Sequence, residues 1–164
     1  MKKSQLAETL QEIRFLHDVS PAHLEKLVKA ASLRDFKQAA VVFREGDVAK
    51  CVYLVVTGKV SLEICAPGVG CKRILTVGPG ELLGWSALLD ETRLTATART
   101  IEPTQLVELD ADRLLALFDK NPRVGYEFTR RAMQAVSKRL SATRMQLVDV
   151  FGSQLPAVAY ATED

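Results

Sequence analysis

The sequence predicts an α+β protein in which an antiparallel β-roll or jelly roll follows short helices and precedes a long helix. Helical spacing of apolar residues is confined to the two ends of the chain. Between them, short β-rich runs alternate with glycine turns at residues 45–47, 57–58 and 78–80. Short strands separated by such turns are typical of antiparallel sandwiches and jelly rolls.

Residues 1–32 are the predicted N-terminal helical segment. Leu6, Leu10 and Ile13 recur at helical spacing over residues 5–16. Ser20 is a favourable N-cap, and Pro21 suits the first helical position. The apolar residues that follow recur at i, i+3, i+4 and i+7, so we expect a second helix over residues 21–31.

Residues 33–110 are the predicted β-roll, which contains the candidate ligand cassette. Residues 60–64 alternate apolar and polar side chains, as half-buried strands do. A hairpin loop at residues 66–70 leads to a return strand over residues 72–77. After a polar loop at residues 90–92, we expect a strand over residues 93–99 and a last strand over residues 104–109.

Residues 111–151 are the predicted C-terminal helices, with Asp110 as the N-cap of the first and Pro122 at the start of the second. Positions on the second helix step alternately by three and four residues, which is a heptad seam with one polar member. We expect this dimer helix to pair in a parallel homodimer rather than to pack only on its own β domain. Residues 152–164 show no period and are the predicted mobile tail. The seam residues are Met133, Val136, Leu140, Thr143, Leu147 and Val150.

Composition excludes several classes of protein. The formal net charge of +2 does not suggest nucleic-acid binding, and an apolar content of 48% excludes a largely disordered chain. We find neither an apolar run as long as a membrane span nor a secretory signal, so we expect a cytoplasmic protein without a membrane partner. Two histidines and three cysteines supply a metal site poorly. No nucleophile–base pair or catalytic carboxylate pair stands out, so we do not expect an enzyme.

Cys65 and Cys71 flank the hairpin loop at residues 66–70 and could face each other across it. Ordinary packing is the preferred interpretation, because disulfides are rare in the cytosol and cysteine is commonly buried. A redox pair is the alternative.

The candidate site begins where Gly80 and Gly84 bracket a short apolar segment. Ser86 and Ala87 could begin a helical turn with free N–H groups, and such a turn can hold an anion. A strand, a loop and another strand with no ligand would give the same pattern. The glycines alone do not decide between the two.

Four motifs in order resemble the cyclic nucleotide-binding domain of the catabolite-activator (Crp/Fnr-like) family, over about residues 15–150. They lie at residues 43–47, 53–60, 79–84 and 96–97. The resemblance implies a β-roll that holds a cyclic nucleotide in a phosphate-binding cassette. It also implies a long helix that dimerises and lies over the purine.

Two recognition positions depart from the family pattern. The family has a glutamate after the second glycine, which binds the ribose 2′-hydroxyl, and an arginine about nine positions later, which pairs with the cyclic phosphate. Here these positions are Trp85 and Leu94, and neither side chain can make those contacts. Each lost charge-assisted hydrogen bond costs about 1.5–3 kcal/mol. We therefore expect cyclic-nucleotide binding to be weaker by roughly a hundredfold to ten-thousandfold.

The resulting prediction is a stand-alone, dimeric, ligand-sensing regulatory module whose pocket departs from the cAMP and cGMP consensus. We expect no cofactor other than a cyclic nucleotide or another small ligand. Two alternatives stay open: true cAMP or cGMP binding through Arg93, and a ligand-free scaffold for a protein partner. Only residues 152–164 follow the long helix, too few for a helix-turn-helix domain, so we expect no direct sequence-specific DNA binding. The candidate ligand-binding residues are Gly84, Trp85, Ser86, Ala87, Arg93, Leu94, Thr95, Ala96 and Thr143, the last where the family offers a hydroxyl to the purine.

Overall fold

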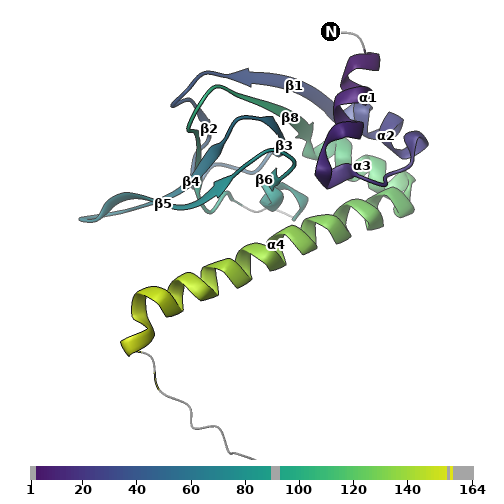
Figure 1. Cartoon of the computed structure of the whole chain (residues 1–164). Coiled ribbons are helices and arrows are strands. Elements are labelled where there is room, and N and C mark those ends of the chain that lie inside the picture. The colour runs from purple at the N-terminus through teal and green to yellow at the C-terminus, as the bar shows by residue number, and fades with distance from the viewer. Residues whose placement is uncertain (1–2, 90–92, 155, 157–164) are drawn as a thin grey trace, which may run out of the picture.

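A computed structural model describes residues 3–89, 93–154 and 156 (Figure 1). It confirms the predicted α+β class, since two four-stranded antiparallel sheets form a jelly-roll-like unit with helices before and after it. The sheet orders are β1-β8-β3-β6 and β2-β7-β4-β5. The strands are β1 (Ala31–Phe36), β2 (Val41–Phe43), β3 (Cys51–Thr57), β4 (Val60–Ala66), β5 (Gly70–Val77), β6 (Leu82–Leu83), β7 (Thr97–Thr100) and β8 (Thr104–Asp110).

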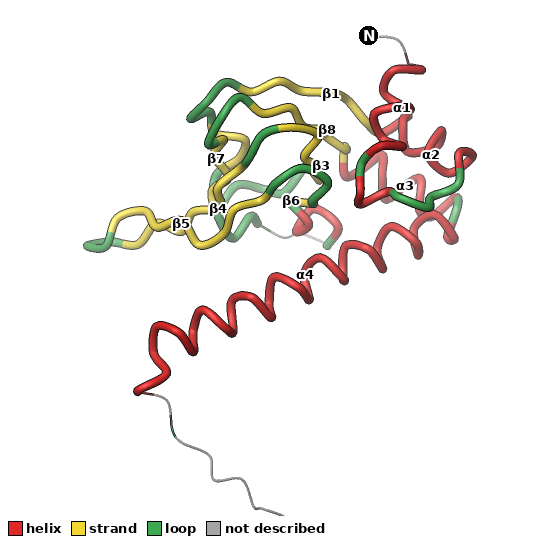
Figure 2. The backbone as a smooth tube through the Cα atoms, viewed as in Figure 1, coloured by secondary structure: helices red, strands yellow, loops and turns green. Residues whose placement is uncertain are grey.

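The helices gather at one end of the β-roll, except for the last long one, which runs below the roll and away from it (Figure 2). Both predicted N-caps form, because the Ser20 side chain accepts from the His23 N–H and that of Asp110 from the Arg113 N–H. The α-helices are α1 (Lys3–Glu12), α2 (Pro21–Leu27), α3 (Ala111–Lys120) and α4 (Pro122–Phe151), and the short 3-10 helices are η1 (Arg14–Leu16), η2 (Val28–Ala30), η3 (Trp85–Leu88) and η4 (Gly152–Gln154).

β3 joins the two parts of the hydrophobic core, because its side chains alternate between the two faces of the sheet. Val52 and Leu54 belong to the cluster that includes the helices, whereas Tyr53 and Val55 belong to the cluster contributed by both sheets. Phe128 of α4 is 2% exposed and joins the helical cluster. The first part of α4 is therefore held on the domain, while every residue from 141 to 151 is exposed.

Three element boundaries differ from the sequence prediction. The first predicted helix ends at Glu12 and is followed by η1, and the second gives way to η2 after Leu27. The strand expected over residues 93–99 begins only at Thr97. Leu94 instead exchanges backbone hydrogen bonds with the turn after β2, donating to the Asp47 carbonyl at 2.9 Å and accepting from the Gly46 N–H at 2.8 Å.

The predicted polar loop at residues 90–92 and most of the predicted tail lie outside the described residues. None of the helices in the described part of the chain combines the length and the apolarity that a membrane crossing requires.

Candidate functional site

The turn after β6 lies directly against β3, and a glycine is required there. Gly84 has φ +72° and caps η3. A Cβ at this position would lie 2.8 Å from the carbonyl oxygen of Cys51 and 3.1 Å from the ring of Tyr53. The predicted helical turn forms as η3, but the Ala87 N–H is not free, because it donates to the Gly84 carbonyl at 3.2 Å.

A recess of about 40 Å³ opens beside this turn. Leu94 is 7% exposed, and the half-buried Trp85 packs against the main core cluster. The recess walls are therefore largely apolar at the two positions where the resemblance led us to expect an arginine and a glutamate. Its lining residues include six of the predicted set, namely Gly84, Trp85, Ser86, Leu94, Thr95 and Ala96, together with Phe43, Leu62 and Arg139.

Three predicted ligand-binding residues do not line the recess. Ala87 is 4% exposed and belongs to the core. Arg93 is exposed, and its Nη1 donates to the Gly46 carbonyl at 2.7 Å. Thr143 is exposed on α4, and its Oγ1 donates to the Arg139 carbonyl at 2.9 Å. The predicted ligand-binding residues after η3 therefore contribute no cation to the recess in this structure.

The cation in the recess comes from α4 instead. The Arg139 side chain is partly buried, and its Nη2 donates to the carbonyl of Leu82. Burial lowers the pKa of Arg139, while the nearby Glu81 carboxylate raises it. This geometry lets the recess offer one guanidinium to an anionic group and apolar walls to the rest of a ligand.

Sequence reasoning missed Arg139, because basic residues on a helix usually cover a solvated face. The spacing of apolar residues on α4 does point to this arginine. Steps of four, three and four residues lead from the buried Phe128 through Ala132 and Ala135 to Arg139. Such steps follow one helix face, so the face that packs on the domain continues to this arginine.

The predicted seam lies on a different face of α4. Met133, Leu140, Leu147 and Val150 are exposed large apolar residues, and Val136 is half-buried. The domain in this single chain therefore leaves most of the seam uncovered.

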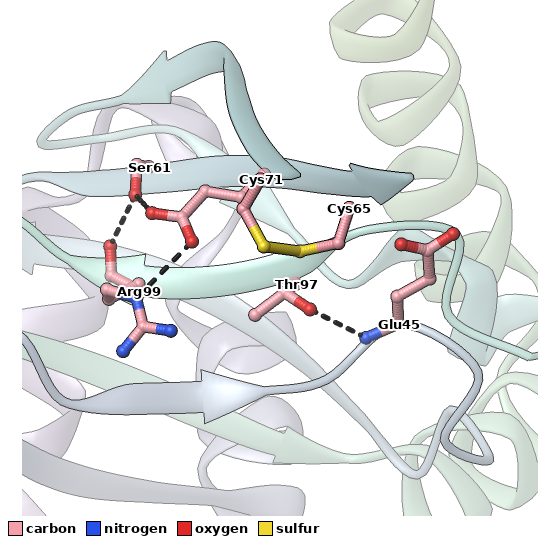
Figure 3. The surroundings of a disulfide bond; sticks show 7 residues. Glu45, Ser61, Cys65, Cys71, Thr97 and Arg99 are labelled. Carbon is pink, nitrogen blue, oxygen red and sulfur yellow. Dashed lines mark hydrogen bonds and ion pairs between the residues drawn. A yellow bond between two sulfur atoms is a disulfide. The ribbon is translucent and has the colours of Figure 1, made fainter. Parts of the chain in front are cut away.

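Cys65 and Cys71 stand directly opposite each other in the β4–β5 register and are joined by a disulfide (Figure 3). The preferred interpretation of ordinary packing was therefore wrong, since both residues are exposed on the hairpin and bonded to each other. This hairpin projects from the β-roll at the end away from α1, α2 and α3 (Figure 1). Cys51 is the free cysteine of the described chain, and burial raises the pKa of its thiol. Among the described residues, no group of three or more histidine, cysteine, aspartate or glutamate side chains could hold a metal ion.

Comparison with known proteins gives one family. The family model described as "Cyclic nucleotide-binding domain" matches residues 33–121. The chain is 27% identical over 150 residues to the CRP-like cAMP-activated global transcriptional regulator of Mycobacterium tuberculosis, covering 91% of this chain and 65% of that protein. It is 31% identical over 145 residues to the cyclic AMP receptor protein of Thermus thermophilus, covering 88% of this chain and 66% of that protein. The chain thus spans slightly less than two thirds of these relatives.

Solved structures agree with the sequence comparison. The Thermus thermophilus catabolite activator protein superimposes with a TM-score of 0.67 at 29% identity, over 83% of this chain and 63% of that one. A putative cyclic nucleotide-binding protein from Geobacter metallireducens superimposes with a TM-score of 0.72 at 25% identity, over 82% of this chain and 97% of that one.

Proposed function

The chain belongs to the cyclic nucleotide-binding domain family, and from this membership we propose that it is a dimeric, ligand-sensing regulatory module whose pocket departs from the cAMP and cGMP consensus. The observation that carries the proposal is the recess beside η3. Its turn is tight, with Gly84 in the left-handed region at the start of η3, and the side chains at the two recognition positions are Trp85 and Leu94. The role is regulatory rather than catalytic, as the names of the relatives suggest.

A ligand in this recess would act on α4. Ligand pockets typically measure about 300–1,000 Å³, far more than the 40 Å³ available here. Movement of Arg139 off the Leu82 carbonyl, with a shift of the middle of α4, would open room for such a ligand. Because the start of α4 is held by Phe128, the exposed second half would swing about that anchor. The ligand would then favour one of two helix positions according to its differential affinity for them.

We propose that the exposed seam on α4 pairs two copies of the chain. Apolar side chains in a heptad seam gain stability by packing against an equivalent helix. Sedimentation equilibrium of wild type, Leu147→Glu and Gln146→Glu tests this. Both variants add one negative charge to neighbouring exposed positions, but only Leu147 is in the seam. A dimer that Leu147→Glu dissociates and Gln146→Glu leaves intact supports the pairing, whereas a monomeric wild type contradicts it.

Calorimetric titration with cAMP and cGMP tests the ligand, with Trp85 fluorescence as a local reporter since it is the only tryptophan. We expect weak binding by wild type, and an affinity at least a hundredfold higher in the double variant Trp85→Glu with Leu94→Arg, which restores both recognition groups. Micromolar binding by wild type that is lost in Arg93→Ala would replace the drifted-pocket proposal with ordinary second-messenger binding.

A protein-interaction scaffold is the second candidate function. The small volume of the recess and the packing of Trp85 against the core favour it. No heat and no fluorescence change at millimolar nucleotide, in either the wild type or the restored variant, would support the scaffold.

A further inference from the structure

A larger cleft lies next to the recess, and Arg139 lines both. We call it the α4 cleft, because one wall is formed by Arg131, Lys138 and Arg139 of that helix. Arg14 and Glu81 belong to the opposite wall. The cleft measures about 410 Å³, which is within the range of roughly 300–1,000 Å³ that small-molecule sites occupy.

Cations outnumber acids in this cleft, and most of its other lining residues are apolar. Arg14 of η1 faces it together with the three cations from α4, and Glu81 is the only acidic residue among its described lining residues. The Glu81 carboxylate already accepts a hydrogen bond from the Gly78 N–H at 2.7 Å.

Two of the cleft cations donate hydrogen bonds to backbone carbonyls. Arg131 donates to the carbonyl of Phe15 at 3.1 Å, and Arg139 donates to that of Leu82. Neutral carbonyls do not cancel a positive charge. Within residues 3–89 and 93–154, neither arginine forms an ion pair, nor does Arg14 or Lys138. Glu81 lies near Arg139 but forms no salt bridge with it, so an anion in the cleft would further compensate this partly buried guanidinium.

A second basic hollow, lined by residues of α2, η2 and α3, gives a matched comparison. It has the same volume of about 410 Å³ and is lined by Lys26, Lys29, Arg113 and Lys120. Two of its cations have a role within the fold: the Lys26 ammonium donates to Asn121 Oδ1 at 2.6 Å, and Lys120 lies in the last turn of α3, where the helix dipole favours positive charge. The α4 cleft differs in the type of its cations, which are three arginines and one lysine rather than three lysines and one arginine.

We propose that the α4 cleft is a binding site for a small polyvalent anion of the diphosphate or triphosphate class, held by Arg139, Arg131 and Arg14. The planar guanidinium fork matches phosphate oxygens in pairs, and these arginines approach from both walls of the cleft. The site adjoins the cassette recess and shares Arg139 with it, but its other two arginines do not line the recess.

Calorimetry with inorganic pyrophosphate and tripolyphosphate at fixed ionic strength tests the site. The paired variant Arg131→Gln with Arg139→Gln should weaken binding of either probe at least tenfold, as expected for the loss of charge-assisted contacts. The matched control, Lys29→Gln with Lys120→Gln, removes the same charge from the other hollow and should change affinity less than twofold. Circular dichroism establishes that each variant is folded.

Arg14→Gln gives an independent measurement if the paired variant fails to fold. Arg14 is exposed and forms no side-chain hydrogen bond to other described residues, so its loss should weaken binding several-fold without affecting stability. The proposal is overturned if wild type binds neither probe at millimolar concentration, or if the control pair weakens binding as much as the cleft variants do.

Discussion

Replacing Gly84 by alanine tests the packing that holds the candidate turn on β3. The residue has φ +72°, and an alanine in the left-handed region costs about 1–2 kcal/mol. The added Cβ would also lie 2.8 Å from the Cys51 carbonyl oxygen, a backbone atom that cannot rotate away. Relieving such an overlap costs roughly a further 1–3 kcal/mol. Gly84→Ala should therefore lower the free energy of unfolding by about 2–5 kcal/mol.

Gly46→Ala is the matched control for this substitution. Gly46 has φ +84°, but a Cβ there would meet nothing within 4 Å, so only the backbone cost of about 1–2 kcal/mol applies. At about 2–4 °C per kcal/mol for a chain of this size, Gly84→Ala should melt roughly 2–12 °C below Gly46→Ala. Thermal unfolding is followed at equal protein concentration by circular dichroism and by the fluorescence of the adjacent Trp85. Equal melting temperatures for the two variants would refute the close packing of the turn on β3.

Three further substitutions or reactions test other parts of the structure. Glu63→Gln should destabilise the protein at neutral pH but not in acid. The hydroxyl of Ser61, with which Glu63 shares a 2.7 Å hydrogen bond, lowers the pKa of its carboxyl. The resulting stability is present above the unfolded-state pKa and is lost as pH falls through the folded-state pKa, so urea midpoints of variant and wild type should converge at low pH. Phe128→Ala should cost about 3–5 kcal/mol, because the ring is 2% exposed and anchors α4; a loss below about 1 kcal/mol in urea unfolding would contradict that anchor. Cys51 should react slowly with a thiol reagent, because burial raises the pKa of its thiol, and a reductant should release two faster thiols from the hairpin disulfide.

The parts of the fold predicted correctly from the sequence are those encoded locally. Ser20 and Asp110 cap their helices because a cap depends on side chains and amides within one turn. The prediction of a strand over residues 93–99 was wrong for residues 93–96, because their backbone partners are distant in the sequence. The backbone of Leu94 bonds to a turn at Gly46 and Asp47, and the alternation of side chains carries no information about that distant partner.

The same limit applies to the candidate site. Its glycine turn and the two altered recognition positions could be predicted, since the motifs fix their places in the chain. Arg139 could not be ranked by composition, because its role depends on how α4 crosses β6. The buried stripe that begins at Phe128 was the available signal, but a charged residue at the end of such a stripe usually reaches out to solvent.

The position of Arg139 between the recess and the α4 cleft makes the two proposals interdependent in one measurable way. An anion in the cleft would draw the guanidinium off the Leu82 carbonyl and out of the recess. A neutral or apolar ligand in the recess would gain room and bind more tightly, whereas an anionic ligand such as cAMP would lose its nearest cation. Coupling between two sites is reciprocal. Measuring the affinity for cAMP with and without tripolyphosphate therefore shows whether the coupling between the sites is positive or negative. We expect tripolyphosphate to weaken cAMP binding in wild type and to have no effect in Arg139→Gln. Equal weakening in both would show that the two anions do not meet at Arg139.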